Sequence, residues 1–305
     1  MSNKPKIIVI LGQTTTGKSD FAVQLARVLA VSGVEIEIIS ADSRQVYTGM
    51  DIGTGKISRK EMQKIPHHLL DVASPKKTFS VSAFKKLADK KIKEIVKRGH
   101  VPIICGGTGF YIDAIVDGVV LPEVPPNQKL RKILEKKSPQ QLFSILKKLD
   151  PIRAKTIDEK NSVRLIRAIE IARSLGHVPK ATIDQKYAVL KIGLALPDEI
   201  LKDNIQKRLI TRMKKGMLKE IQKLHNQGMS WKRMEALGLE YRYGALHLQG
   251  KITKQEMIEK LQIEIWHYAK RQKTWFKRDK DTIWIDPREI HQKAKALKKV
   301  KGFLK

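Results

Sequence analysis

The sequence is poor in several features that would each define a class of protein. Among its 305 residues Cys105 is the single cysteine, which excludes an intramolecular disulfide framework and a zinc site built from cysteines. The chain has no run of about 18 apolar residues, so we expect no transmembrane helix. It has no signal-peptide cleavage site after Met1 and no repeat with a period of about 20–50 residues. These absences predict a cytoplasmic protein.

Acidic residues are scarce relative to basic ones. The chain has 61 Lys and Arg against 31 Asp and Glu, which gives a formal net charge of +30. Such a surface attracts polyanions, and nucleic acid is the favoured partner. A lysine-rich adaptation for solubility or heat and attraction to an anionic membrane are the two alternatives that composition leaves open.

One stretch near the start of the chain carries the strongest local signal. Residues 6–11 form a short apolar run rich in β-branched residues, which predicts a buried parallel strand. Residues 12–19 fit the phosphate-loop pattern G-x-x-x-x-G-K-[ST], and the apolar residues after them recur at helical spacing. Strand, glycine loop and helix in this order predict a diphosphate or triphosphate site. The residues of this predicted site are Gly12, Gln13, Thr14, Thr15, Thr16, Gly17, Lys18 and Ser19, with the Ser19 hydroxyl as a ligand for Mg²⁺.

Two further strands are expected to end beside this loop. Residues 35–40 predict a strand that delivers Asp42, whose carboxylate could be a metal ligand, a helix N-cap or a general base. Residues 101–105 predict a strand followed by Gly106-Gly-Thr108. There the glycines would let the backbone approach a ligand and Thr108 could donate to a phosphate oxygen, or the segment is a tight strand–helix turn.

Other segments carry weaker signals. Residues 49–56 predict a glycine-rich and mobile loop. Residues 65–72 predict a short strand on which His67 and His68 point to opposite faces, so they should not share a metal. Cys105 is expected to pack inside its strand rather than act as a nucleophile.

The order of the predicted elements indicates an α/β protein with a parallel sheet flanked by helices. Prolines at 121–127 mark a boundary, and residues 129–175 read as a small, basic, all-helical insertion. Strand and helix patterns resume at 188–196, at 198–227 with a break near Gly216, at 253–278, and at 282–286. We therefore expect a core of residues 1–122 and 188–286, an insertion domain of 123–187, and a basic tail of 287–305 that forms a peripheral helix.

The helix predicted at 253–278 combines basic and aromatic residues. This combination suits backbone phosphates and stacked bases. A helix with Trp275 and Phe276 in the core and a solvated basic face is the alternative, and the two can both hold.

Several segments together resemble the tRNA dimethylallyltransferases, the tRNA isopentenyl transferase family of bacteria and organelles. The matching segments are Asp42-Ser-Arg-Gln-Val-Tyr47, Met50-Asp-Ile-Gly-Thr54, Pro66-His-His-Leu-Leu-Asp71, Gly106-Gly-Thr108, Arg164-Leu-Ile-Arg-Ala-Ile-Glu170, Arg208 and Arg212, and Ala269-Lys-Arg-Gln272. They run in one order through residues 7–286. The chain departs from the family at Gln13, Thr15 and Thr16 of the phosphate loop, and at Leu237–Arg242 and Ile265–Trp266. The last two departures leave the chemical residues intact and bear on RNA specificity alone.

The resemblance implies a P-loop NTPase-like fold and a prenyl transfer. The dimethylallyl group of dimethylallyl diphosphate would pass to the exocyclic amine of adenosine 37 in the anticodon stem-loop of tRNA. Asp42 would be the general base, Thr108 would contact the departing oxygen, and Lys18 and Arg212 would stabilise the diphosphate. Mg²⁺ would be the cofactor, held by Ser19, with Asp42 as the candidate second ligand. The residues implied to contact tRNA are Asp42, Ser43, Arg44, Gln45, Thr108, Arg131, Val163, Arg164, Leu165, Ile166, Arg167, Lys270 and Arg271. We expect a monomer that does not bind membranes.

Three other functions compete with this prediction. They are a phosphoryl-transferring P-loop kinase, an isopentenyltransferase acting on free adenine nucleotides, and an RNA-binding protein that keeps the fold without catalysis. The basic insertion and the late aromatic–basic helix argue against the kinase, and the insertion and the net positive charge argue against the enzyme for free nucleotides. The retained Lys18, Ser19, Asp42 and Thr108 argue against the third function.

Overall fold

The computed structural model describes residues 4–119, 122–180 and 182–305. Its centre is a six-stranded sheet in which every paired strand is parallel. The strands are β1 (Lys6–Gly12), β2 (Ile36–Ser40), β3 (His67–His68), β4 (Val101–Gly106), β5 (Ala188–Leu194) and β6 (Ile283–Ile285), in the order β3-β2-β4-β1-β5-β6. The predicted α/β class with a parallel sheet is confirmed, and the strand carrying the phosphate loop lies between β4 and β5.

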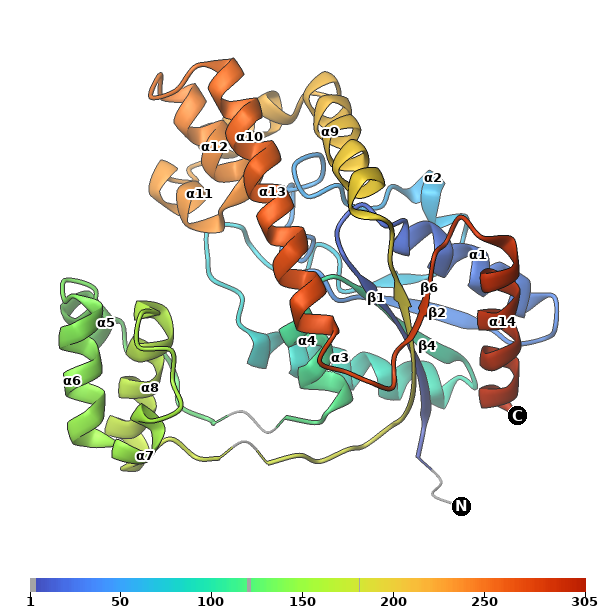
Figure 1. The fold of residues 1–305 in the computed structure, drawn as a ribbon, viewed down its shortest axis with the longest axis horizontal. Helices are drawn as coiled ribbons and strands as arrows, with labels where there is room; N and C mark the ends of the chain where they lie inside the picture. The colour runs from blue at the N-terminus through green and yellow to red at the C-terminus, as the bar shows by residue number, and fades with distance from the viewer. Residues whose placement is uncertain (1–3, 120–121, 181) are drawn as a thin grey trace. The chain divides into compact units, whose positions relative to one another are not determined.

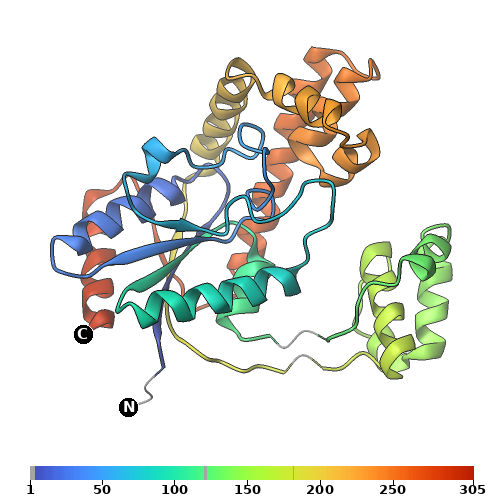
Figure 2. The same ribbon diagram turned by 180° about the vertical axis from the view of Figure 1, so that it is seen from behind.

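Successive side chains of β1 point to opposite faces of the sheet and contribute to two separate buried clusters. Ile7, Val9 and Leu11 belong to one buried cluster, whereas Ile8 and Ile10 belong to the other. The first face is covered by α3 (Val81–Lys97), α4 (Gly109–Val116) and α13 (Lys254–Phe276). The second face is covered by α1 (Lys18–Ala30) and α14 (Ile290–Leu304), as Figures 1 and 2 show from opposite sides.

The C-terminal helix differs from the predicted peripheral tail. Ala296 and Val300 of α14 are fully buried in the cluster that covers the second face, and Lys6 Nζ donates to the Leu304 carbonyl at 3.1 Å. The face that carries Ala296 and Val300 is therefore part of the core, whereas Ile290 at the start of the helix is exposed.

Four helices follow β5 and extend the buried cluster of the first face, packing on α13 and on one another. They are α9 (Asp198–Lys214), α10 (Met217–Asn226), α11 (Trp231–Leu237) and α12 (Leu239–Leu248). The predicted break near Gly216 is confirmed, because Gly216 separates α9 from α10 with a φ of 97°. The helices α11 and α12 were not predicted, and neither was the single turn α2 (Arg59–Met62).

Strand β3 is much shorter than the predicted 65–72 segment. It contains only His67 and His68, because Leu69 and Asp71 adopt positive φ angles of 60° and 56° and so leave the extended conformation.

The helical insertion forms its own compact unit, Gly118–Asp184, and the rest of the chain forms the other. These bounds lie a few residues before the expected 123 and 187. The insertion contains α5 (Gln128–Leu134), α6 (Pro139–Leu149), α7 (Pro151–Ala154) and α8 (Ser162–Leu175). It buries a separate apolar cluster around Leu142, Leu146, Leu165 and Ile169.

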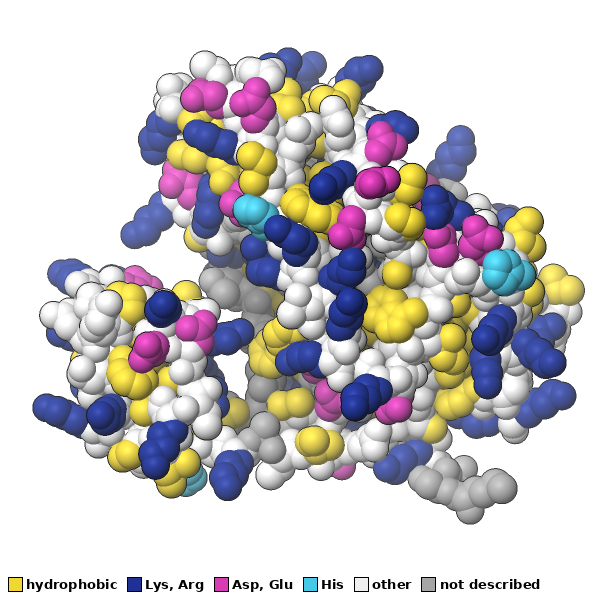
Figure 3. Space-filling model, in the orientation of Figure 1, with side chains coloured by type: hydrophobic (Ala, Val, Ile, Leu, Met, Phe, Trp, Pro, Cys, Tyr) yellow, Lys and Arg dark blue, Asp and Glu magenta, His cyan; other side chains and the backbone are white. Residues whose placement is uncertain are grey.

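The surface agrees with the composition. Figure 3 shows lysine and arginine side chains distributed over the visible face of each unit, with fewer acidic side chains among them. No helix in the described part of the chain is long and apolar enough to cross a membrane.

Candidate active site

A cavity of about 470 Å³ lies at the carboxyl ends of β1, β2 and β4, where a parallel sheet usually binds ligands. Of the residues predicted from sequence, its lining includes Thr14, Thr15, Gly17, Lys18, Ser19, Asp42 and Gln45. Residues that sequence reasoning did not assign to the site also line it, among them Ile38, Ile57, His67, Asn204, Lys207, Arg208, Tyr268 and Gln272. The predicted phosphate loop and the predicted base therefore face one cavity.

The phosphate loop is fixed by helix α13. The Thr14 N–H donates to Gln272 Oε1 at 2.7 Å, and Gln13 Nε2 donates to the Ala269 carbonyl at 3.2 Å. Gln272 Nε2 also donates to the Gly107 carbonyl at 2.8 Å, so one buried amide joins the loops that follow β1 and β4. The signal that could have found Gln272 is its position on the buried stripe of α13, between Ala269 and Phe276.

The Gly106-Gly-Thr108 turn is tight because protein, rather than a ligand, approaches its backbone. A Cβ atom on Gly106 would lie 2.3 Å from the Ala41 carbonyl oxygen, and one on Gly107 would lie 2.3 Å from Gln272 Nε2. Both glycines also line the cavity, so the predicted approach of their backbone to a ligand stays a prediction. The alternative, a tight strand–helix turn into α4, describes these glycines.

The Lys18 side chain binds the backbone of its own loop. Its ammonium donates to the Gln13 carbonyl at 2.5 Å. Burial lowers the pKa of Lys18 to about 8, and the neighbouring Arg208 guanidinium acts in the same direction. The buried Thr15 hydroxyl has no hydrogen-bond partner among the described residues. A bound anion would neutralise the crowded cations and accept from this hydroxyl, as expected for a phosphate loop.

Asp42 caps a turn rather than a helix. Its Oδ1 accepts from the N–H groups of Arg44 at 2.8 Å and Gln45 at 3.3 Å, and these residues form a turn, which excludes the predicted helix cap. Oδ2 accepts no hydrogen bond from the described residues. One oxygen thus orients the carboxylate and leaves the other available in the cavity.

The Thr108 side chain makes hydrogen bonds to two residues, Ser43 of this turn and Tyr268 of α13. Its hydroxyl oxygen accepts from the Ser43 N–H at 3.0 Å and is hydrogen-bonded to Tyr268. Burial raises the pKa of the Tyr268 phenol, so this group stays neutral at physiological pH. Thr108 therefore connects the Asp42 turn to α13.

Two arginines one turn apart on α9 have different surroundings. Arg208 lines the cavity, and burial lowers its pKa to about 10. Arg212 does not line it, because its guanidinium is bound by Glu240 at 2.5 Å and by the Gly53 carbonyl at 3.0 Å. The resemblance implied that Arg212 binds the diphosphate, whereas the arginine that lines the cavity is Arg208.

Several residues predicted to bind tRNA lie outside the cavity. Arg44 Nε donates to the Leu237 carbonyl at 3.0 Å, which directs this side chain to the end of α11. Lys270 and Arg271 are exposed on α13, where Lys270 lies 5.8 Å from the Trp266 ring centre and Arg271 lies 6.0 Å from that of Tyr268. These two cations and their aromatic neighbours form a surface that could contact RNA.

In the helical insertion, the predicted contact residues differ in exposure. Val163 and Arg164 are exposed, whereas Leu165 and Ile166 are buried in the core of this unit. Arg131 makes two hydrogen bonds of 2.7 Å to Glu170, which also binds Arg167 at 3.3 Å. Burial alone would raise the pKa of Glu170, but these bonds hold it below its usual value. Arg131 and Arg167 are therefore ordered by a buried carboxylate.

The residues present fit a magnesium ion bound mainly through a ligand. The described residues contain no group of three or more Asp, Glu, His or Cys side chains that could hold a metal. Ser19 and Asp42 line the same cavity. Mg²⁺ keeps several waters and commonly binds phosphates with one or two protein ligands, which this sparse arrangement permits.

Comparisons with known proteins agree with this geometry. A family model described as IPP transferase matches residues 45–279. A curated relative, tRNA dimethylallyltransferase 2 of Treponema denticola, is 43% identical over 285 residues and covers 91% of this chain and 93% of its own length. A second, tRNA dimethylallyltransferase 1 of Syntrophus aciditrophicus, is 40% identical over 301 residues, with 96% and 97% covered.

Solved structures resemble the whole chain. The tRNA isopentenylpyrophosphate transferase of Bacillus halodurans has a TM-score of 0.74 and 34% identity, with 99% of this chain and 97% of that chain covered. A eukaryotic dimethylallyltransferase acting on tRNA has a TM-score of 0.76 and 28% identity, with 89% and 70% covered. Both the sequence matches and the structural matches extend over most of the chain, and the protein belongs to the IPP transferase family.

Proposed function

We propose that this protein transfers the dimethylallyl group of dimethylallyl diphosphate to the N6 amine of adenosine 37 in tRNA. The names of its relatives support the reaction class. The observation that carries the proposal is the shared cavity: the phosphate loop with Lys18 faces the same space as Asp42, whose Oδ2 is free of hydrogen bonds from the described residues. A diphosphate and a proton acceptor can therefore act on one substrate pair.

The reaction follows from these positions. The N6 nitrogen bonds to C1 of the allyl group while the bond from C1 to the diphosphate oxygen breaks, and the electron pair leaves with the diphosphate. Lys18, Arg208 and the loop N–H groups stabilise the charge that develops on the leaving group. Asp42 accepts the N6 proton through Oδ2, with its orientation set by the bonds to Oδ1.

Magnesium fits the leaving-group side of this site. Bound to the diphosphate oxygens and the Ser19 hydroxyl, Mg²⁺ would neutralise negative charge as the diphosphate departs. Ser19 is exposed at the cavity and makes no hydrogen bond through its hydroxyl within the described residues, so it is free to ligate.

The acceptor amine belongs to a base of tRNA, and this base must enter the cavity. Adenosine 37 lies in a tRNA loop and would have to be unstacked to enter. Gln45 lines the cavity and can hydrogen-bond a base edge. The basic surfaces on α13 and on the helical insertion suit the phosphates of the anticodon arm.

The proposal is tested by following labelled dimethylallyl diphosphate with Mg²⁺ and three acceptors in parallel. We expect label in unmodified tRNA and none in free AMP, and we expect no phosphoryl transfer from ATP. Label in AMP would instead support a transferase for free nucleotides. Tight tRNA binding without any label would support an RNA-binding protein that keeps the fold.

A further inference from the structure

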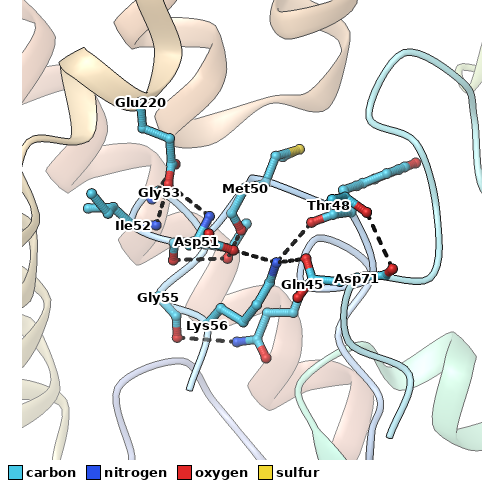
Figure 4. A network of polar contacts seen from close by, with 12 residues as sticks. Gln45, Thr48, Met50, Asp51, Ile52, Gly53, Gly55, Lys56, Asp71 and Glu220 are labelled. Atoms are coloured by element: carbon cyan, nitrogen blue, oxygen red, sulfur yellow. Dashed lines mark hydrogen bonds and ion pairs between the residues drawn. The ribbon is translucent and has the colours of Figure 1, made fainter. Parts of the chain in front are cut away.

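The loop of residues 49–56, which the sequence predicted to be mobile, is held by side chains from other elements (Figure 4). Glu220 of α10 accepts from three consecutive backbone N–H groups, those of Asp51 at 2.8 Å, Ile52 at 2.7 Å and Gly53 at 3.0 Å. Consecutive N–H groups that converge in this way form a nest for an anion. The carboxylate occupies that nest, and hydrogen bonds to a charged acceptor are about twice as strong as neutral ones.

The Glu220 carboxylate is itself held in position by a buried side chain. The hydroxyl of Tyr241, which is buried, donates to Glu220 Oε1 at 2.7 Å. The loop lies directly on this ring, since a Cβ atom on Gly53 would be 2.7 Å from it. At the other end of the loop, Lys56 Nζ donates to the Tyr47 carbonyl at 2.9 Å and to Asp51 at 2.6 Å. The backbone between these anchors has one defined path.

The far side of the loop faces the cavity. The Gly55 carbonyl accepts from Gln45 Nε2 and from Arg208 Nη2, each at 3.3 Å. Because a carbonyl only accepts, this contact fixes which end of the Gln45 amide is the NH₂ group, and its Oε1 accepts from the Ser40 hydroxyl at 3.4 Å. Gln45 and Arg208 both line the cavity, whereas Glu220 does not.

We propose that Glu220 is a positioning residue for the transfer reaction, which rests on the proposed function. By binding the N–H groups of residues 51–53 it sets the position of the Gly55 carbonyl. That carbonyl in turn orients the Gln45 amide toward the acceptor base and the Arg208 guanidinium toward the diphosphate. Glu220 touches neither substrate and acts only through this loop.

The test compares Glu220→Gln with the matched control Glu259→Gln. Glu259 is exposed on α13 and accepts a hydrogen bond from Gln255. Both changes raise the net charge by one, so their non-specific effect on RNA binding is the same. Glutamine cannot offer acceptor oxygens to all three N–H groups, because one end of its amide is a donor.

Two readouts do not depend on tRNA as the acceptor. Backbone amide exchange in residues 51–53 should accelerate in Glu220→Gln and remain unchanged in Glu259→Gln. Inorganic diphosphate should bind Glu220→Gln about tenfold more weakly than the wild type in a calorimetric titration, with the thermal midpoint shifted by less than about 4 °C. Equal exchange and equal diphosphate affinity in the two variants would overturn the proposal.

A double-mutant cycle separates positioning from general destabilisation. If Glu220 acts through Arg208, then adding Glu220→Gln to Arg208→Lys should weaken diphosphate binding by less than about twofold. Additive losses would overturn this route. Should Glu220→Gln fail to fold, Tyr241→Phe removes one of the four bonds to the carboxylate. It should then weaken diphosphate binding about twofold or more, and unchanged binding and exchange would contradict the proposal.

The two proposals fail in different ways. A wild-type protein that binds diphosphate but leaves tRNA unlabelled would refute the proposed function while the loop experiments still report on Glu220. Normal tRNA labelling with identical behaviour of Glu220→Gln and Glu259→Gln would refute the positioning role alone.

Discussion

The pKa of Lys18 predicts that use of the diphosphate substrate falls steeply on the alkaline side of neutrality. Burial lowers this pKa to about 8, so the free protein loses the ammonium charge as the pH rises through that value. The charged form would be about 90% of the total at pH 7 and about 10% at pH 9. If only the charged form grips the leaving diphosphate, kcat/KM for dimethylallyl diphosphate should fall about tenfold between these pH values.

Neighbouring groups do not titrate in the same interval. Burial raises the pKa of the Cys105 thiol to about 12, and the pKa of Arg208 is about 10. Once diphosphate is bound, its negative charge should raise the pKa of Lys18, so kcat at saturating substrate should change much less than kcat/KM.

The assay is initial-rate label transfer to tRNA from pH 7 to pH 9.5 at constant ionic strength. Lys18→Arg is the control, because a guanidinium stays charged throughout this range. It should react more slowly, since its geometry differs, but without the alkaline loss. A flat kcat/KM profile in the wild type, or an alkaline loss that persists in Lys18→Arg, would refute the assignment of this titration to Lys18.

Three further predictions concern the site and its support. Asp42→Asn should lower kcat for prenyl transfer by about 100-fold or more, while filter-binding affinity for tRNA stays near the wild-type value; unchanged turnover would exclude Asp42 as the base. Arg208→Leu should weaken inhibition by inorganic diphosphate, whereas Arg212→Leu should lower thermal stability by about 3–5 kcal/mol because it leaves Glu240 buried without its cation; the reverse pattern would restore Arg212 to the diphosphate site. Glu37→Gln should destabilise the fold by about 3 kcal/mol at neutral pH, measured by urea unfolding. Burial would raise the pKa of this carboxyl, but bonds from Arg98 and two histidines lower it to about 2. The ionised Glu37 carboxylate contributes to the free energy of unfolding above about pH 4.5, and this contribution is lost as the pH falls toward 2. The difference in unfolding free energy between variant and wild type should therefore shrink in acid. A difference that grew in acid would contradict the reasoning.

The local part of the site could be predicted from sequence because its signal is local. The strand, glycine loop and helix of residues 6–30 lie next to one another in the chain, and their spacing alone gives the conformation that the structure shows. The same holds for the turn at Asp42, which must follow its strand. The order of the strands in the sheet could not be predicted in this way. Strand order depends on how the connections between strands pack against the sheet, and no single segment specifies that.

Long-range contacts explain what sequence reasoning missed. Gln272 lies 258 residues from its partner Thr14, and nothing near either residue specifies the bond. Arg208 and Arg212 have the same chemistry on one helix, and only the position of Glu240 decides which of them faces the cavity. Glu220 gave no local signal either, because its role depends on a loop that is about 170 residues away in the chain.

The most direct test of the whole account is the identity of the modified nucleoside. An unmodified anticodon stem-loop would be incubated with dimethylallyl diphosphate, Mg²⁺ and the protein, digested to nucleosides and analysed by mass spectrometry, beside a stem-loop with guanosine in place of adenosine 37. The account predicts N6-dimethylallyladenosine from the first RNA and no modified nucleoside from the second. Modification of both RNAs, or of neither while diphosphate is bound, would contradict it.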